Sequence, residues 1–402
     1  MFAIRILRLI KRELTDVVLS DWRLTIMIFI MPVAYTALLG FLYMEKRVSE
    51  VPVMIIDHDN GALSRSIATA VDRSDGMRVV GMASGMDEVR EAVLARKAYA
   101  AIWIPPDFER DIKKGKQAKL LTVADGSNMM LSNTVVAAMA RVAGTFSAAV
   151  EMKTLNMKGA PSDHLQGKAM PIDGATRVWY NPTYNYNTFV MVGLISVIVQ
   201  QITLVGCALA FARERQHGLL PQILKITDSP LEVLAAKGIF YTVVNLITAL
   251  AAFWMSLKYF GINFYGSAWL FFMMLTVFII AIVGLGICAS AILGDELFAT
   301  EALMLVSLPS FLLSGFTWPD FAMLPGIKFI SWILPLTHFI MPLRTVFMQG
   351  GGFEHIRSDM LWLWTLAAAS YLIAYIVIWR SMANARVKLE KEPSVRYALV
   401  PN

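Results

Sequence analysis

The chain has 402 residues, of which 57% are hydrophobic and only 16% are charged. Soluble globular proteins average about 45–50% apolar and about 25% charged residues, so this composition argues against a wholly soluble fold. The formal net charge of +6 would also suit a nucleic-acid-binding protein. However, the basic residues cluster beside long apolar runs, which favours a lipid bilayer and not nucleic acid as the partner.

Residues 1–23 are predicted to form an amphipathic interface helix on the cytoplasmic membrane surface. At about 100° per residue, apolar side chains gather on one side of this helix and basic ones on the other, a pattern typical of interfacial helices. Glu13 falls inside the apolar stripe. Its side chain either reaches polar surroundings from a tilted helix or faces a protein partner instead of lipid.

Six segments are apolar enough to cross a bilayer, which needs about 20 mostly apolar residues. They are 24–44, 188–212, 239–257, 267–293, 298–316 and 361–379. Fourteen Lys and Arg residues flank these segments on one side, in 1–23, 213–238 and the tail 380–402, whereas four lie on the other side. Because positive flanks stay in the cytoplasm, both termini and the loop 213–238 are expected there.

Residues 45–187 are predicted to form an inserted extracytoplasmic α/β domain. The segment is nearly neutral, with 18 basic and 16 acidic residues. Expected strands at 51–56, 77–82, 98–105 and 118–125 alternate with expected helices at 64–71, 86–97, 107–115 and 128–156. This alternation favours a sandwich with a partly parallel sheet. Gly, Pro and Asn in 158–187 then indicate a loop that returns to the membrane.

Two connecting segments within the membrane part, 188–379, are longer than simple turns require. The loop 213–238 has a break at Asp228-Ser229-Pro230, which predicts a helix, a short transverse helix and a second helix, although a solvated connector is the alternative. The outer segment 317–360 is apolar but contains four prolines, so short re-entrant or interfacial helices are expected there.

The sequence lacks the motifs that would make this chain an enzyme. It contains no phosphate-binding Gly-rich loop, no nucleophile elbow and no paired Cys or His-Glu-x-x-His metal motif. Ionisable residues are scarce inside the spans, which argues against a proton-coupled carrier. Asp295, Glu296 and Glu301 are expected to form an acidic turn at the membrane surface. The energy for transport would therefore come from another chain.

Three motifs in the chain are similar to those of a known family. The first is the pattern E-R-x-x-G-T-x-E, followed by Glu and Lys at fourteen and nineteen residues after the Gly, and its matching residues are Glu214, Arg215, Gly218, Glu232 and Lys237. The chain departs from this pattern at Leu219, Pro221 and Thr227. The second motif, an outer re-entrant one, includes Pro309, Ser314, Gly315, Pro319, Pro325, Pro335, Arg344 and Gly350, and the third is "KREL" at 11–14 together with Pro32. With these motifs the whole chain resembles the membrane subunits of type-2 ABC exporters, in particular bacterial ones with a large extracytoplasmic domain after the first span.

The resemblance implies a function for these segments. Two permeases, identical or related, would pair in the bacterial inner membrane, and each would engage a separate ABC ATPase that carries ATP and Mg²⁺, so no cofactor is expected on this chain. A periplasmic adaptor and an outer-membrane channel are possible partners. The ATPase would be coupled through Arg12, Glu13, Glu214, Arg215, Gly218, Leu219, Leu220, Glu232 and Lys237. The exit would be formed by the re-entrant segment, including Ser314, Gly315, Pro319, Pro335, His338 and Arg344.

The predicted function is thus export of an amphipathic or hydrophobic substrate, driven by ATP on the partner subunit. Two alternatives remain open at this point: a membrane-anchored receptor or scaffold that acts through residues 45–187, and a secondary carrier. His338 and Arg344 are either buried, satisfied structural residues, or Arg344 anchors the re-entrant segment or contacts an anionic substrate group.

Overall fold

The computed structural model describes residues 2–44, 48–157, 179–182 and 185–391. Most of the predicted return loop and the end of the predicted tail lie outside these residues. The chain divides into two compact units, a helical unit (1–46 and 180–402) and an inserted unit (47–179). Each unit is described by itself.

The inserted unit contains a four-stranded mixed sheet. Its strands are β1 (Val51–Asp57), β2 (Met77–Met82), β3 (Ala100–Ile104) and β4 (Leu121–Ala124), in the order β2-β1-β3-β4. Strand β1 runs parallel to both β2 and β3, whereas β4 is antiparallel to β3. The partly parallel sheet predicted from the alternation of strands and helices is confirmed.

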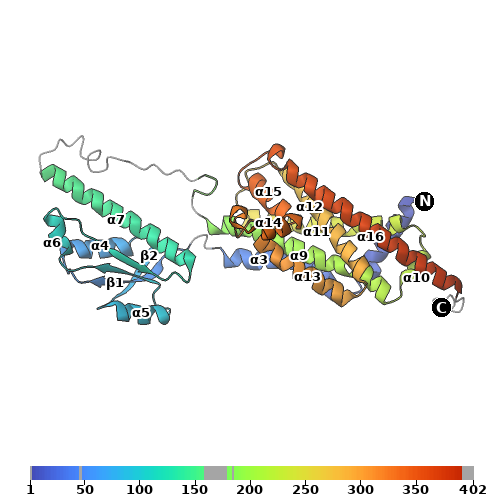
Figure 1. Ribbon diagram of the computed structural model, residues 1–402, viewed down its shortest axis with the longest axis horizontal. Coiled ribbons are helices and arrows are strands. Elements are labelled where there is room, and N and C mark those ends of the chain that lie inside the picture. Colours follow the sequence, from blue (N-terminus) through green and yellow to red (C-terminus); the bar gives the residue numbers. More distant parts are fainter. Residues whose placement is uncertain (1, 45–47, 158–178, 183–184, 392–402) are drawn as a thin grey trace. The chain divides into compact units, whose positions relative to one another are not determined.

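Helices cover both faces of this sheet (Figure 1). They are α4 (Ala62–Asp72), α5 (Met86–Leu94), α6 (Phe108–Lys113) and α7 (Met129–Met157). One face of the sheet buries Val53 and Ile55 against Ile67 of α4 and Val135 of α7. The other face buries Ile56 against Val89 of α5. Because β1 is covered on both sides, it reads as a continuous apolar run.

The helical unit contains the predicted spans. The helices before the insertion are α1 (Phe2–Arg12), the π-helical segment η1 (Glu13–Val18), α2 (Trp22–Thr25), the π-helical segment η2 (Ile26–Ile30) and α3 (Met31–Leu42). Those after it are α9 (Tyr186–Gln216), α10 (Leu220–Leu224), α11 (Pro230–Tyr259), α12 (Ala268–Leu293), α13 (Glu296–Leu313), α14 (Pro325–Ile333), α15 (Thr337–Phe347) and α16 (Arg357–Lys391). Two short 3₁₀ turns, η4 (Asp320–Ala322) and η5 (Phe353–His355), flank the α14–α15 segment.

Seven helical segments among the described residues are long and apolar enough to cross a membrane. Six are in the helical unit and match the predicted spans: α2 to α3, α9, α11, α12, α13 and α16. The seventh is α7 of the inserted unit, although this helix was predicted to be part of the α/β domain and not a span. Several spans are longer than predicted, and α16 continues to Lys391, so the expected tail at 380–402 begins as part of a helix.

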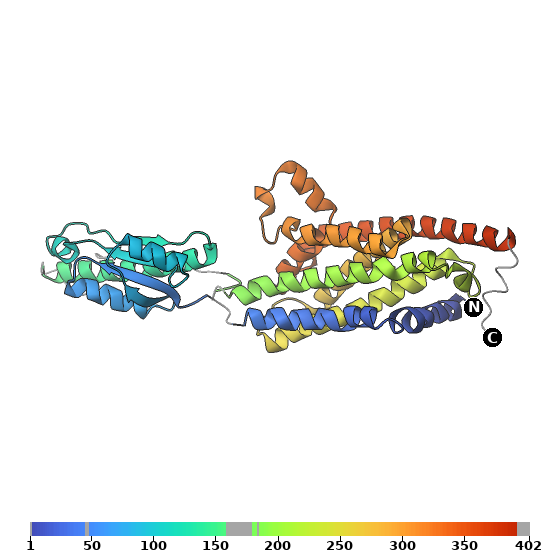
Figure 2. The same ribbon diagram turned by 90° about the horizontal axis from the view of Figure 1, so that it is seen from below.

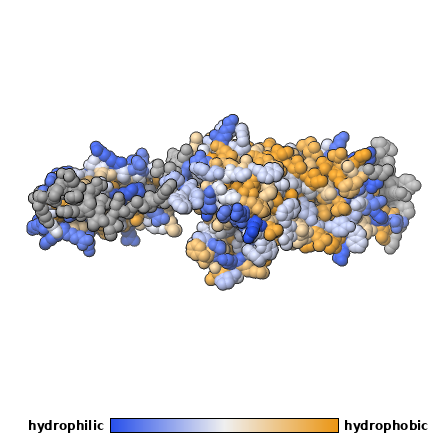
Figure 3. All heavy atoms as spheres, turned by 90° about the horizontal axis from the view of Figure 1, so that it is seen from above, coloured by the Kyte–Doolittle hydropathy of each residue, from blue (hydrophilic) through white to orange (hydrophobic). Residues whose placement is uncertain are grey.

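The two ends of the bundle differ in what they contain. Helices α1 and α10 and the last turns of α16 lie at one end, whereas α14 and α15 lie at the other (Figures 1 and 2). Between the ends, hydrophobic side chains cover much of the face seen in Figure 3. A broad apolar surface of this kind suits contact with lipid.

Helix α12 is central to the bundle and packs against both α9 and α16. Its contact with α9 is unusually close, because a Cβ atom added at Gly286 would come within 2.4 Å of the Cβ of Cys207. One turn further along, the Ser290 hydroxyl accepts hydrogen bonds from the backbone N–H groups of Phe211 and Ala212, at 2.9 and 2.8 Å. Gly286 thus lets the Ser290 side chain of α12 bind the backbone of α9.

The segment 317–360 contains a bent pair of helices. Helices α14 and α15 meet at an angle of 81°, with Pro335 in the break between them and Pro342 inside α15. Proline cannot donate the backbone hydrogen bond that a straight helix needs. The expectation that 317–360 contains short helices and not one straight span is therefore confirmed.

Candidate functional site

A buried ionic cluster joins three segments at the α1 end of the bundle. Lys237 Nζ of α11 lies 2.7 Å from Glu13 Oε2 and 3.1 Å from Glu214 Oε1 at the end of α9. Arg12 Nη1 also binds Glu214 Oε1, at 2.7 Å, and the Tyr241 hydroxyl donates to Glu13 Oε1, at 2.9 Å. Glu13, Glu214 and Lys237 are each 3% exposed or less, so these ions are removed from water.

The local structure explains how these side chains meet. Lys237 and Tyr241 are four residues apart on α11, so they project from the same face of that helix. Glu13 begins the π-helical segment that follows the amphipathic α1, and α1 packs against α11. The apolar stripe of α1 therefore carries Glu13 into the bundle, where two partners from α11 receive it.

The charges of this cluster balance, because two carboxylates face one ammonium and one guanidinium. A buried ion pair is tolerated only when such partners replace the lost water. Burial raises the pKa of Glu13, and the nearby Glu214 carboxylate adds to this effect, whereas Lys237 and Tyr241 oppose it. Among the described residues, Glu214 Oε2 has no hydrogen-bond partner.

The expected coupling loop, residues 213–238, folds as a helix, a short helix and a second helix, as predicted. Gly218 ends α9 with φ of +65°, a left-handed conformation that suits glycine, and the Leu219 N–H binds the Glu214 carbonyl at 2.8 Å. Pro221 lies in the first turn of α10, where its missing N–H costs nothing. Leu220 packs against the hydrophobic core, whereas Gly218 is exposed and Leu219 is half-buried.

Thr227, which departs from the family pattern, has a clear structural role. Its hydroxyl donates to the Glu232 carboxylate and accepts the N–H of Ser229 at 3.0 Å. Ser229 in turn caps α11 by accepting the N–H of Glu232. Arg5 of α1 lies 3.7 Å from the other Glu232 oxygen. Thr227 therefore fixes the start of α11 where the family has a proline.

Further polar contacts hold the same end of the bundle. Glu296 at the start of α13 contacts His217 at 3.0 Å and Arg213 at 4.0 Å, and Arg213 also contacts Asp21 at 3.3 Å. Arg215 donates to the Ala291 carbonyl at the end of α12, at 3.3 Å. These contacts tie the coupling loop to the N-terminal segment and to the α12–α13 turn.

The opposite end of the bundle, at α14 and α15, holds a second group of polar residues. His338 contacts the Asp359 carboxylate with Nδ1 and the Trp332 carbonyl with Nε2, both at 2.8 Å. Both ring nitrogens of His338 are therefore engaged. His338 is 2% exposed, and its contacts join the break between α14 and α15 to the start of α16.

Arg344 of α15 has a different environment. Its guanidinium lies 5.0 Å from the ring centre of Phe189 and 4.8 Å from that of Phe316, which is cation–π geometry. No acidic residue in the described part of the chain forms an ion pair with Arg344, and its buried Nε has no partner there. Ser314 and Gly315 lie buried at the end of α13, Pro319 is exposed and Pro335 is buried.

The structure brings some of the expected coupling residues together and separates others. Arg12, Glu13, Glu214 and Lys237 form one cluster, with Glu232 beside it. Neither reading of Glu13 holds as predicted, because its partners are Lys237 and Tyr241 of this same chain. The accessible residues of the coupling set are at the end of α9 and at α10: Arg215, Gly218, Leu219 and Leu220.

Sequence reasoning missed several participants. Tyr241 lies one helical turn after Lys237, a spacing that could have identified it as a second contact on the same face. Asp359 lies in the first turn of α16, where acidic residues are common, so the sequence alone did not single it out. Arg5, Asp21 and Arg386 gave no comparable signal, because basic and acidic residues at a membrane surface are common.

These features define a multi-pass membrane protein with a buried ionic cluster at one end of its helical bundle and a bent helix pair at the other. A family model described as "ABC-2 family transporter protein" matches residues 22–376. The chain therefore belongs to the ABC-2 family of transporter membrane proteins.

Three relatives from Escherichia coli (strain K12) illustrate the similarity. The "Probable multidrug ABC transporter permease YbhR" is 24% identical over 380 residues, which cover 94% of this chain and 99% of the relative. The "Inner membrane transport permease YhhJ" is 26% identical over 330 residues, 81% of this chain and 84% of the relative. The "Probable multidrug ABC transporter permease YbhS" is 26% identical over 258 residues, 64% and 66% respectively. The family resemblance seen in the sequence is thus confirmed.

Proposed function

We propose that this chain is the permease subunit of an ATP-driven exporter that moves an amphipathic or hydrophobic substrate out of the cytoplasm or the inner membrane. It would pair with a second permease, identical or related, and each permease would engage a separate ABC ATPase that holds ATP and Mg²⁺. The relatives named as multidrug permeases support this proposal, as does the absence of a phosphate-binding loop from the sequence.

The buried cluster at Lys237 is the observation that carries the mechanism. It joins the N-terminal segment, the end of α9 and the start of α11 through bonds of 2.7 to 3.1 Å. Two of these segments are connected by the coupling loop, so a push on α10 would reach all three together. Arg12, Glu13, Glu214, Glu232 and Lys237 would therefore transmit movement inside the chain. Arg215, Gly218, Leu219 and Leu220 would meet the ATPase.

We propose a topology of six spans with both termini in the cytoplasm. The inserted unit would then lie on the opposite, extracytoplasmic side of the membrane. The excess of basic residues at the α1 end supports this orientation. Helix α7 would then be a helix of the α/β domain, because it buries Val135, Ala138 and Met139 against the sheet and α4. A periplasmic adaptor and an outer-membrane channel are further partners that this placement would allow.

The bent helices α14 and α15 would close the exit. His338 would hold the break between them to α16 through Asp359. Arg344, a cation beside two aromatic rings, would anchor α15 against Phe189 of α9 and Phe316, which follows α13. An amphipathic substrate would leave past this closure when the two permeases separate.

The proposal can be tested by isolating the complex. Purification of the chain in mild detergent, followed by mass spectrometry, should yield an ABC ATPase in a stoichiometric amount. The Leu219→Asp variant places a charge on the half-buried surface at the start of α10, so the ATPase should be lost from the complex. Leu324→Asp is the matched control, because Leu324 is 73% exposed in the outer segment, and it should retain the ATPase.

Two results would contradict the proposal. If no ATPase accompanies the unmodified chain, the protein is not an exporter permease, and a receptor acting through the inserted unit becomes the better account. If Leu219→Asp retains the ATPase as fully as the control does, the coupling surface is not at α10. Size-exclusion chromatography of each variant separates loss of binding from loss of folding.

A further inference from the structure

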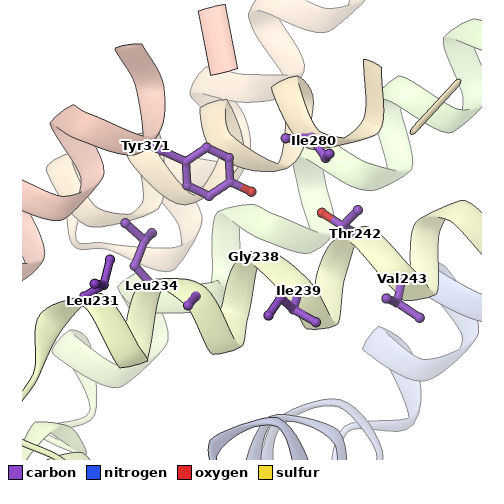
Figure 4. Close-up of a pocket in the computed structure, with 9 residues that line it drawn as sticks. Leu231, Leu234, Gly238, Ile239, Thr242, Val243, Ile280 and Tyr371 are labelled. Atoms are coloured by element: carbon purple, nitrogen blue, oxygen red, sulfur yellow. The ribbon is translucent and has the colours of Figure 1, made fainter. Parts of the chain in front are cut away.

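A groove with a volume of about 420 Å³ lies between helices α11 and α16, with α12 as its floor (Figure 4). Its apolar lining includes Leu231, Leu234 and Gly238 of α11 and Ile280 of α12. Binding sites for small organic ligands have volumes of about 300–1,000 Å³, so the groove is large enough to hold part of a ligand. Part of its lining lies in the last turns of the coupling loop, but none of the lining residues belongs to the ionic cluster or to the surface proposed to meet the ATPase.

The groove has few polar atoms, and they face each other. Figure 4 shows the side chains of Tyr371 of α16 and Thr242 of α11 pointing toward one another. Tyr371 also lies over Gly238, where an added Cβ atom would come within 3.1 Å of its ring. What remains open to a ligand is a hydrocarbon surface, which suits an acyl chain.

The groove is open along its side. Leu231 and Ile239, which line it, are 53% and 48% exposed, and both belong to a helix that is long and apolar enough to span the membrane. The solvent around such a helix is lipid. A lipid chain can therefore enter from the bilayer without any movement of the protein.

Two arginines lie beside the end of the groove that Leu231 forms. Arg386 of α16 contacts Asp228, three residues before Leu231, at 2.7 Å, and Arg5 of α1 contacts Glu232, the next residue, at 3.7 Å. The side chains of these arginines remain 48% and 43% exposed. Each can therefore turn partly toward a phosphate in the adjacent leaflet, where basic side chains attract anionic lipids.

We propose that this groove binds one acyl chain of an anionic phospholipid, whose phosphate lies between Arg5 and Arg386. The site combines an apolar slot that opens to the bilayer with two exposed cations at the level of the headgroups. This lipid site depends neither on the proposed transport function nor on which leaflet faces the cytoplasm. The bound lipid would fill the gap between α11 and α16 beside the coupling loop.

The acyl-chain part of the proposal is tested by filling the groove. The purified full chain is titrated with palmitoyl-oleoyl phosphatidylglycerol in mixed micelles, and bound lipid is counted by native mass spectrometry. Ala235→Phe places a ring in the groove and should remove the tightly bound lipid. Ile247→Phe is the matched control, because Ile247 is 62% exposed on the same helix beyond the groove, and it should bind as the unmodified chain does. Equal binding by both variants overturns the assignment of the groove.

The headgroup part is tested by comparing phosphatidylglycerol with phosphatidylcholine. Each arginine contributes up to about fivefold to the preference for the anionic lipid, so Arg386→Gln and Arg5→Gln should reduce it, whereas the nearby Lys388→Gln should not. Asp228→Asn removes the acid that competes for Arg386 and should increase the preference, a gain that a misfolded chain cannot show. If the unmodified chain binds both lipids equally, or if Arg386→Gln keeps the full preference, the phosphate site is wrong.

Discussion

Replacement of Lys237 by methionine tests the buried cluster most directly. The ammonium lies 2.7 Å from Glu13 Oε2 and 3.1 Å from Glu214 Oε1, and methionine keeps much of the volume while removing the charge. Two buried carboxylates would then share one guanidinium, that of Arg12. Breaking a buried ion pair by removing one partner costs about 3–5 kcal/mol, and we expect Lys237→Met to lower the free energy of unfolding by that amount.

A second substitution should restore part of this loss. Glu13→Gln in the Lys237→Met background returns the cluster to neutrality, and the glutamine oxygen can still accept the Tyr241 hydroxyl. The double variant should therefore be more stable than Lys237→Met alone, with a coupling energy of about 1–3 kcal/mol. The recovery identifies charge balance, and not simple packing, as the cause.

The Lys237→Met variant should also depend on pH in a defined direction. Burial raises the pKa of Glu13 above its ordinary value of 4.5, and the variant lacks the ammonium that opposes this. A carboxyl group with a raised pKa favours the folded state when it is protonated. The variant should accordingly gain stability as the pH falls through the raised pKa and lose it as the pH rises, and Glu13→Gln should abolish this dependence.

Thermal unfolding of the purified chain in detergent, followed by intrinsic fluorescence, measures these effects. Lys328→Met is the control, because Lys328 pairs with Asp320 at 3.1 Å with side chains that are 55% and 61% exposed, and such pairs contribute about 0–1 kcal/mol. A Lys237→Met variant no less stable than this control would refute the reasoning. Strictly additive losses in the double variant would do so as well.

Three further predictions concern packing, at Gly193 and Arg344 in the helical unit and at Gly144 in the inserted unit. Gly193→Ala should cost about 1–3 kcal/mol, since its Cβ would lie 2.4 Å from the Phe316 ring, whereas Gly144→Ala in α7 meets nothing within 4 Å and should stabilise by about 0.5–1 kcal/mol. Thermal unfolding distinguishes the two. Arg344→Lys keeps the charge but loses the planar contact with Phe189 and Phe316, so it should cost about 1–2 kcal/mol and reduce export; unchanged stability would contradict an anchoring role.

Much of the fold was readable in the sequence because its signals are local. The strand β1 is an apolar run bounded by turn residues, and α11 begins at Ser229-Pro230, a cap followed by a proline in the first turn. Four prolines predicted the broken helices of the outer segment. In each case the residues that decide the structure lie within the element that they shape or directly beside it.

Only part of the candidate site could be predicted from the sequence, because the residues in contact there are far apart along the chain. The apolar stripe of α1 shows that Glu13 points inward, but its partner Lys237 is 224 positions away. The π-helical turn that carries Glu13 also has no signature in the residues. Composition likewise could not separate α7 from a span, since 28 of its residues are as apolar as a membrane helix and only the sheet beside it shows where it packs.

The close contact between α9 and α12 has a mechanical consequence. Gly286 and Ser290 lock the two helices together near the coupling loop, so they cannot slide past each other there. Helix α9 has 31 residues and is therefore about 46 Å long. As a rigid lever pivoting near the loop, it would turn a tilt of about 5° into a displacement of about 4 Å at the far end, on the scale of one helical turn. A small push at α10 would then become a large opening at the exit.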